Sequence, residues 1–107
     1  LTTVHRSLYV EAYSLVKVPV VTTKNFIIYL EEYEGNTFIH CDVTSKWTKT
    51  VKKELMKAFN NLDKKELLAL HKQSDKKHEK FLQLFNFNYL NSFEGKDNTQ
   101  YDVFIWR

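Results

Sequence analysis

His40 and Asp42 stand on either side of Cys41 in a run of residues that favours a β-strand. Because side chains two positions apart share one face of a strand, an imidazole and a carboxylate would lie together there. A histidine beside a carboxylate is the pairing that moves protons in catalysis, but no nucleophile stands at a matching spacing. The pair is therefore a candidate for proton transfer, with an ordinary hydrogen-bonded pair as the alternative. Cys41, on the opposite face, is interpreted as a small core residue.

A second group of candidates is basic and lies in the middle of a chain whose net charge is +3. Such a face is either solvated or a site for phosphate, coenzyme A or nucleic acid. Nucleic-acid binding would require aromatic side chains among the lysines, whereas Trp47 and Phe59 fall on the apolar stripe of the same segment. We therefore do not expect a nucleic-acid partner. The lysines are Lys46, Lys49, Lys52, Lys53 and Lys57.

His78 falls on an apolar helical stripe, where a histidine either packs with a hydrogen bond or serves catalysis or metal binding. No metal-ligating partner stands four residues further on, so no metal site is predicted. The single Cys41 excludes an internal disulfide and a cysteine metal cluster, which fits a reducing, cytoplasmic compartment.

The chain has 107 residues, of which 43% are hydrophobic and 15% aromatic, enough for one core in a single domain spanning 1–107. No apolar run approaches the roughly 18 residues needed to cross a bilayer, and residues 1–7 lack a signal-peptide pattern, so no membrane partner is expected. Two glycines and one proline argue against disorder and against a glycine-rich phosphate loop. The chain begins with Leu1 rather than Met, which is compatible with a missing upstream segment.

Strands are predicted through the first half of the chain. Val16–Thr22 contains the one proline, so we expect a strand at a sheet edge or bent at that proline. Asn25–Tyr33 and Thr37–Val43 flank Glu34-Gly35-Asn36, which predicts a hairpin with Gly35 at positive φ. Both runs are apolar at most positions, which is typical of central strands covered on both faces.

Two helices are predicted by apolar stripes at helical spacing. Thr44 or Ser45 is expected to cap the first helix and Ser74 the second. Asp75 adds negative charge at the start of the second helix, where the helix dipole stabilises it. Asn86 follows the second helix at the position that favours positive φ. The first stripe is Trp47, Val51, Leu55, Ala58, Phe59 and Leu62, and the second is His78, Phe81, Leu82 and Phe85.

The remaining segments complete the order of elements. Glu66–His71 is short and apolar enough for a buried strand, and Asn88–Phe93 and Tyr101–Trp106 flank a polar turn cluster, which predicts a C-terminal hairpin. Leu1–Ser14 fits either a helix or an extended segment. The strand–helix–strand step in the middle implies a right-handed crossover between parallel strands. The fold class is therefore α/β (α+β), with a mixed central sheet and helices packed on it.

The order of elements, together with the segment FLQLFNF, resembles the C-terminal part of the GNAT N-acetyltransferase superfamily. In that family an aromatic-rich helix ends in a Leu-Gly-Phe-like tripeptide before the next strand, and Phe85-Asn86-Phe87 stands there in this chain. The spacing from His78 to Asn86 is also similar to that of small GNAT-like phage proteins of the internal virion and head-assembly type. The resemblance covers the chain from Phe26 to its end.

The resemblance implies a site for acetyl-CoA at the end of Thr37–Val43. A glycine-containing loop there presents backbone amides and a helix N-terminus to the pyrophosphate. The matching stretch in this chain, 46–51, has no glycine, so Lys49 and Val51 place side chains where bare backbone would approach the phosphates. Lysines could act there as point charges. The cofactor-binding residues implied are Val43, Ser45, Lys46, Lys49 and Thr50.

The resemblance also implies an acid and a base. A tyrosine four residues before the tripeptide's central position protonates the leaving thiolate in many of these enzymes, but Leu82 stands there, so Tyr89 is the substitute candidate. The base is usually a glutamate, or a water held by one, on the central strands. The candidates there are Glu31, Glu32, His40 and Asp42, which spacing does not separate.

Two hypotheses about function follow from the resemblance. The first is an acetyl-CoA-dependent N-acetyltransferase with a degenerate cofactor loop, which requires an open helix start facing a cleft between Thr37–Val43 and Glu66–His71. The second is a non-catalytic GNAT-like phage structural or assembly protein, virion-associated, with a protein partner or a second copy of itself. It expects Trp47, Lys49 and Val51 to fill that cleft.

Overall fold

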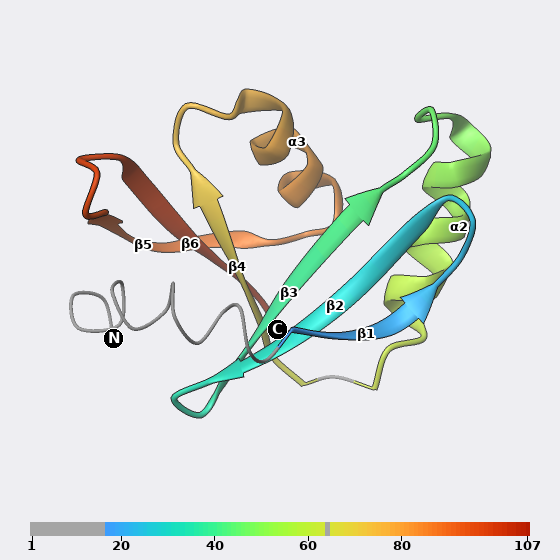
Figure 1. Cartoon of the computed structure of the whole chain (residues 1–107), viewed down its shortest axis with the longest axis horizontal. Helices are drawn as coiled ribbons and strands as arrows, with labels where there is room; N and C mark the ends of the chain where they lie inside the picture. The colour runs from blue at the N-terminus through green and yellow to red at the C-terminus, as the bar shows by residue number, and fades with distance from the viewer. Residues whose placement is uncertain (1–16, 64) are drawn as a thin grey trace.

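The computed structural model describes residues 17–63 and 65–107, which form a six-stranded mixed sheet with two helices on one face (Figure 1). The predicted segment Leu1–Ser14 lies outside the described residues. The sheet order is β1-β2-β3-β4-β6-β5, with β3 and β4 parallel and every other neighbouring pair antiparallel. The predicted mixed sheet is thus confirmed. The elements are β1 Lys17–Thr22, β2 Phe26–Tyr33, β3 Asn36–Val43, α2 Lys49–Asn60, β4 Leu67–Lys72, α3 Lys76–Leu84, β5 Asn88–Glu94 and β6 Gln100–Trp106.

The first three strands match the predicted segments to within a residue or two. β1 is an edge strand with an irregular register between Pro19 and Val21, as its proline predicts. The β2–β3 connection is tighter than predicted, because Tyr33 pairs with Asn36 and only two residues lie in the turn. Glu34 and Gly35 both have positive φ, at 49° and 80°, which is the pattern of a type I′ turn.

The alternation of side chains divides the sheet into two apolar faces. The helix-covered face carries Phe26 and Ile28 of β2, which pack with buried residues of both helices. The opposite face has its own buried cluster around Phe38 of β3, made of residues that are all 8% exposed or less. That cluster is Tyr33, Phe38, Leu68, Val103 and Ile105. The sheet is therefore the centre of the domain, with a buried surface on each side.

Both helices begin later than predicted. Thr48 is the N-cap of α2, and its Oγ1 accepts a hydrogen bond from the amide of Val51 at 3.2 Å, so the prediction of Thr44 or Ser45 was wrong. Asp75 is the N-cap of α3, and its Oδ1 accepts from the amide of His78 at 3.0 Å. The prediction of Ser74 as cap was wrong as well, because the neighbouring carboxylate reaches the free amides of the first turn.

The end of α3 confirms the predicted left-handed turn. Asn86 has φ 65°, and the amides of Asn86 and Phe87 donate to the carbonyls of Gln83 and Leu82, both at 3.0 Å. This pair of bonds is a Schellman motif, which ends the helix and turns the chain directly into β5. None of the described helices is long and apolar enough to span a membrane.

Candidate functional site

The parallel strands β3 and β4 separate toward their carboxyl ends. Their one registered pair is Phe38 with Leu68, and beyond it the two strands diverge beneath α3 (Figure 1). A pocket of about 480 Å³ occupies this opening, within the range of roughly 300–1,000 Å³ typical of small-molecule sites. We name it the β3–β4 pocket. Its walls include 39–43 of β3, Ala69 and Leu70 of β4, and side chains of both helices.

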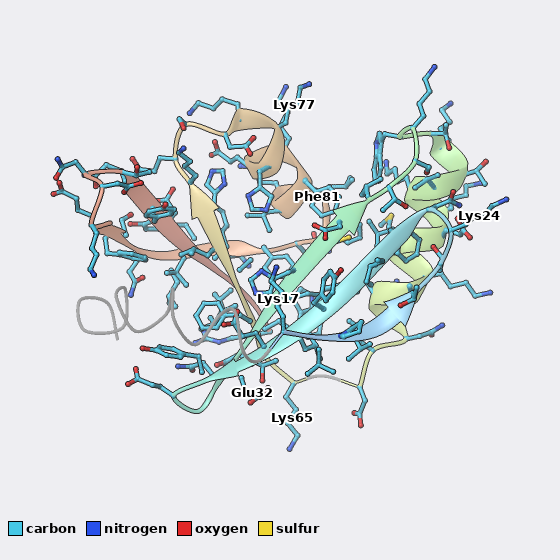
Figure 2. All side chains as sticks on the ribbon, in the orientation of Figure 1. Lys17, Lys24, Glu32, Lys65, Lys77 and Phe81 are labelled. Carbon is cyan, nitrogen blue, oxygen red and sulfur yellow. The ribbon has the colours of Figure 1, made fainter. Side chains whose placement is uncertain are left out.

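The β3–β4 pocket combines apolar side chains of both helices with several polar side chains. Leu55 and Phe59 of α2 and Phe81 and Leu82 of α3 give the apolar wall. In Figure 2, Phe81 lies between α3 and the carboxyl end of β3, and Lys17 lies over the sheet further from α3. The titratable side chains around the pocket are Lys17, His40, Cys41, Asp42, Asp75, Lys77 and His78. The pocket thus offers a dry wall for an apolar group and a few polar groups to orient it.

Glu31 and His40 form a hydrogen-bonded pair beside this pocket. Nε2 of His40 lies 2.7 Å from Oε1 of Glu31, whose side chain is completely buried, whereas the His40 ring lines the pocket. The pair forms because the two-residue turn sets His40 opposite Tyr29, which leaves Glu31 as its diagonal neighbour on the same face. The structure therefore joins two of the predicted base candidates, and the carboxylate holds the imidazole at the pocket wall.

The pKa of His40 is lowered to about 4, chiefly by burial and also by the nearby Lys17 ammonium, against the opposing effect of Asp42. The ring is therefore uncharged at neutral pH. With Glu31 ionised, Nε2–H of His40 donates to its carboxylate. With Nε2 engaged by Glu31, Nδ1 is the nitrogen through which His40 would exchange a proton with a bound molecule.

Acid is expected to destabilise the fold through this ring. A folded-state pKa of about 4, against 6.5 for the free side chain, means that the unfolded chain binds the proton first. The contribution of uncharged His40 to the free energy of unfolding is fully present above pH 6.5 and is lost as the pH falls toward 4. The loss amounts to at most about 3 kcal/mol. Urea unfolding of the wild type and of His40→Gln between pH 7.5 and 4 measures it. The variant should show a flatter dependence on pH, and equal slopes for the two proteins would contradict the expectation.

The other predicted catalytic residues lie in different surroundings. Asp42 lines the β3–β4 pocket and acts on His40 only through its charge, so the predicted His40–Asp42 contact is replaced by His40–Glu31. Tyr89 is 59% exposed on β5, bonded to Ser92 Oγ at 2.6 Å, and does not line the pocket. Glu32 accepts from Thr37 and is exposed. Of the four strand candidates, the structure thus brings Glu31, His40 and Asp42 to one region.

The predicted cofactor residues divide between the pocket and the segment that follows it. Val43 lines the pocket, whereas Ser45, Lys46, Lys49 and Thr50 are not part of its wall. Ser45 is half-buried and the other three are exposed. The amides of Lys49 and Thr50, in the first turn of α2, make no hydrogen bond within the described part of the chain. An open helix start therefore lies next in sequence to the pocket wall.

The side chains expected to fill the cleft lie elsewhere. Val51 points into the core, 5% exposed. Trp47 is 43% exposed and packs against Phe81, with 5.8 Å between ring centroids. Lys49 is exposed at the start of α2. None of the three lines the β3–β4 pocket.

Cys41, predicted as a small core residue, is half-buried against the helix-side core and also lines the β3–β4 pocket, which the sequence did not indicate. Burial raises the pKa of the Cys41 thiol to about 11, so the thiol at the pocket wall is protonated at neutral pH and a poor nucleophile.

His71 of β4 is completely buried, and its Nδ1 lies 3.0 Å from Nδ1 of His78 on α3. The only sequence signal is a histidine ending an apolar strand. Among the described residues, no three metal-ligating side chains gather into a metal site.

Comparison with known proteins identifies no relative of this chain. The chain matches no family model, no curated protein and no solved structure.

Proposed function

We propose that the chain binds acetyl-CoA in the β3–β4 pocket and transfers the acetyl group to an amine, as a GNAT-like protein with an altered cofactor loop. The observation that carries the proposal is the divergence of two parallel strands around a pocket whose wall holds His40, backed by the buried Glu31. The order of elements behind the GNAT resemblance supports it as well.

The position of the acyl donor follows from the polarity of the surroundings. The thioester and its acetyl group suit the apolar wall formed by α2 and α3, whereas the phosphates suit the open start of α2. Lys46 and Lys49 flank that helix start and supply positive charge in place of the missing glycine loop. Thr48 already satisfies the amide of Val51, so the amides of Lys49 and Thr50 are the donors available to a phosphate.

The Glu31–His40 pair supplies the proton acceptor. An amine nitrogen attacks the thioester carbonyl carbon, and the new C–N bond leaves a positive charge on nitrogen. Uncharged His40 accepts that proton, and the Glu31 carboxylate 2.7 Å away stabilises the resulting imidazolium. The C–S bond then breaks, the thiolate takes a proton from solvent, and His40 releases the amine proton to solvent and returns to its uncharged form. A base of this kind contributes about 10²- to 10⁴-fold in rate.

The glycine-free loop favours one alternative, a GNAT-like assembly protein that has no turnover. Under this alternative the β3–β4 pocket would be a structural remnant. The two proposals differ in what acetyl-CoA does when it is added.

Isothermal titration of the full chain with acetyl-CoA at millimolar concentration tests the proposal. We expect the heat of binding to saturate as acetyl-CoA is added. Desulfo-CoA, which lacks the thioester, is the control for binding through the nucleotide alone. Thiol release is then followed with a panel of primary amines. The absence of heat would refute the acetyltransferase proposal, and binding without thiol release would favour the non-catalytic alternative.

A further inference from the structure

The His71–His78 pair lies between the buried face of the sheet and the β3–β4 pocket. The two rings come from β4 and α3, with centroids 5.0 Å apart and the Nδ1 atoms 3.0 Å apart. His71 is completely buried and packs edge-on against Phe104, whereas His78 is half-buried and lines the pocket. His78 therefore stands between its buried partner and whatever the pocket holds.

The contact between the two Nδ1 atoms restricts where the protons lie. One Nδ1 must carry hydrogen and the other must accept it. If His78 were the donor, His71 would carry its own hydrogen on Nε2, which is buried and has no hydrogen-bond partner among the described residues. Orphaned buried N–H groups are rarer than under-satisfied acceptors. The favoured arrangement has His71 donating from Nδ1, and this places the hydrogen of His78 on Nε2.

We propose that His71 holds His78 as its neutral Nε2–H tautomer, and that this N–H donates to the carbonyl oxygen of a thioester bound in the pocket. The inference rests on the proposed acyl transfer and assigns two further residues to it. His78 is then a catalytic residue, and His71 is a positioning residue that acts only through His78.

The surroundings of His78 favour an uncharged donor. Burial lowers the pKa of His78, and His71 lowers it further, while Asp75 at the start of α3 acts in the opposite direction. The other charged or titratable groups at the pocket wall are Lys77 on α3, Lys17 on β1, and His40, Cys41 and Asp42 on β3. A neutral N–H in a largely apolar wall interacts most strongly with oxygen when negative charge develops there.

The step can be written without a proton passing through His78. As the amine attacks, the carbonyl electron pair moves onto oxygen, and the His78 Nε2–H bonds to that oxyanion. The electron pair on oxygen forms the carbonyl bond again when the C–S bond breaks, and the amine proton goes to His40. The thiolate takes its proton from solvent, so His78 ends the step as it began. One donor of this kind is typically worth about 10²- to 10³-fold in rate.

The tautomer can be read directly by ¹⁵N NMR of the full-length chain at pH 7.5 without any ligand. Two-bond correlations distinguish a protonated ring nitrogen from a bare one. We expect His78 to carry hydrogen on Nε2 alone and His71 on Nδ1 alone. A His78 ring protonated on Nδ1, or on both nitrogens, would overturn the inference while leaving the proposed function untouched.

Paired variants test the role in transfer. His78→Leu removes the donor, whereas His78→Gln keeps an amide N–H near the position of Nε2. We expect kcat to fall at least tenfold in His78→Leu, with KM nearly unchanged and partial recovery in His78→Gln. Equal kcat values for His78→Leu and the wild type would overturn the inference.

His71 is tested by the same comparison. His71→Asn keeps a donor near the position of Nδ1, and His71→Leu does not. With [1-¹³C]acetyl-CoA as the probe, the carbonyl resonance should move downfield on binding to the wild type and to His71→Asn, and less in His71→Leu. A shift of equal size in all three proteins would show that His71 does not position the donor. If acetyl-CoA fails to bind at all, the proposed function and the carbonyl contact fall together, and the tautomer measurement still stands.

Discussion

Glu31→Gln is expected to lower kcat for acetyl transfer by about 10²-fold or more, with little change in the affinity for acetyl-CoA. Glutamine keeps the size of the side chain and an oxygen that can accept from Nε2 of His40, but it removes the negative charge. The imidazolium that forms when His40 takes the amine proton would then lack the carboxylate that now lies 2.7 Å away. Thiol release under saturating acetyl-CoA and amine measures the effect.

Glu32→Gln is the matched control for this change. Glu32 is the next residue of β2, so its exposed side chain lies on the other face of the sheet, where it accepts from Thr37. The control should retain wild-type kcat. Equal losses in the two variants would indicate a general effect of charge on the strand, and full activity of Glu31→Gln would exclude the Glu31–His40 pair as the base.

The Glu31–His40 pair shows why the fold could be predicted from the sequence and the site could not. The strands were visible in the apolar runs, but the pairing depends on the number of residues in the turn. A connection through Glu34, Gly35 and Asn36 would set His40 opposite Leu30, on the face away from Glu31. The two-residue turn sets it opposite Tyr29 instead. A difference of one residue in register reverses the face of every side chain, so spacing alone could not separate Glu31 from Glu32.

The helix caps show a similar limit on a smaller scale. Several residues before each helix have side chains that can accept from free amides, and composition does not decide among them. Thr48 and Asp75 are the caps because each is the last residue before the backbone becomes helical, in α2 and α3 respectively. Asn86 was predictable because a single position satisfied both the end of the stripe and a positive φ.

The histidines show what depends on tertiary structure alone. His71 ends an apolar strand and His78 lies on an apolar helical stripe, and each fits an ordinary core position when considered separately. Only the packing of α3 against the sheet brings their Nδ1 atoms to 3.0 Å. The two histidine-containing pairs then lie on opposite faces of the sheet, and the opening between β3 and β4 lets one ring of each reach a common pocket. This arrangement could accept a proton on one side of a bound thioester and stabilise charge on the other.

Cys41→Trp is expected to weaken acetyl-CoA binding by about 100-fold, or roughly 2.7 kcal/mol. Cys41 is half-buried on the helix-facing side of β3 and lines the β3–β4 pocket. An indole at this position would occupy much of the pocket volume of about 480 Å³. Because the added ring enters open space rather than the packed core, the midpoint of thermal unfolding should change little.

Cys41→Ser is the matched control, because it removes the thiol while keeping the side chain small. Its affinity for acetyl-CoA in isothermal titration should stay within about threefold of the wild type, since the protonated thiol takes no part in the proposed transfer. If Cys41→Trp is folded and still binds acetyl-CoA as the wild type does, the cofactor does not occupy the β3–β4 pocket. If both variants lose binding, the thiol itself contributes to the site. Loss in the tryptophan variant alone is the result that places the acyl donor between the diverging strands.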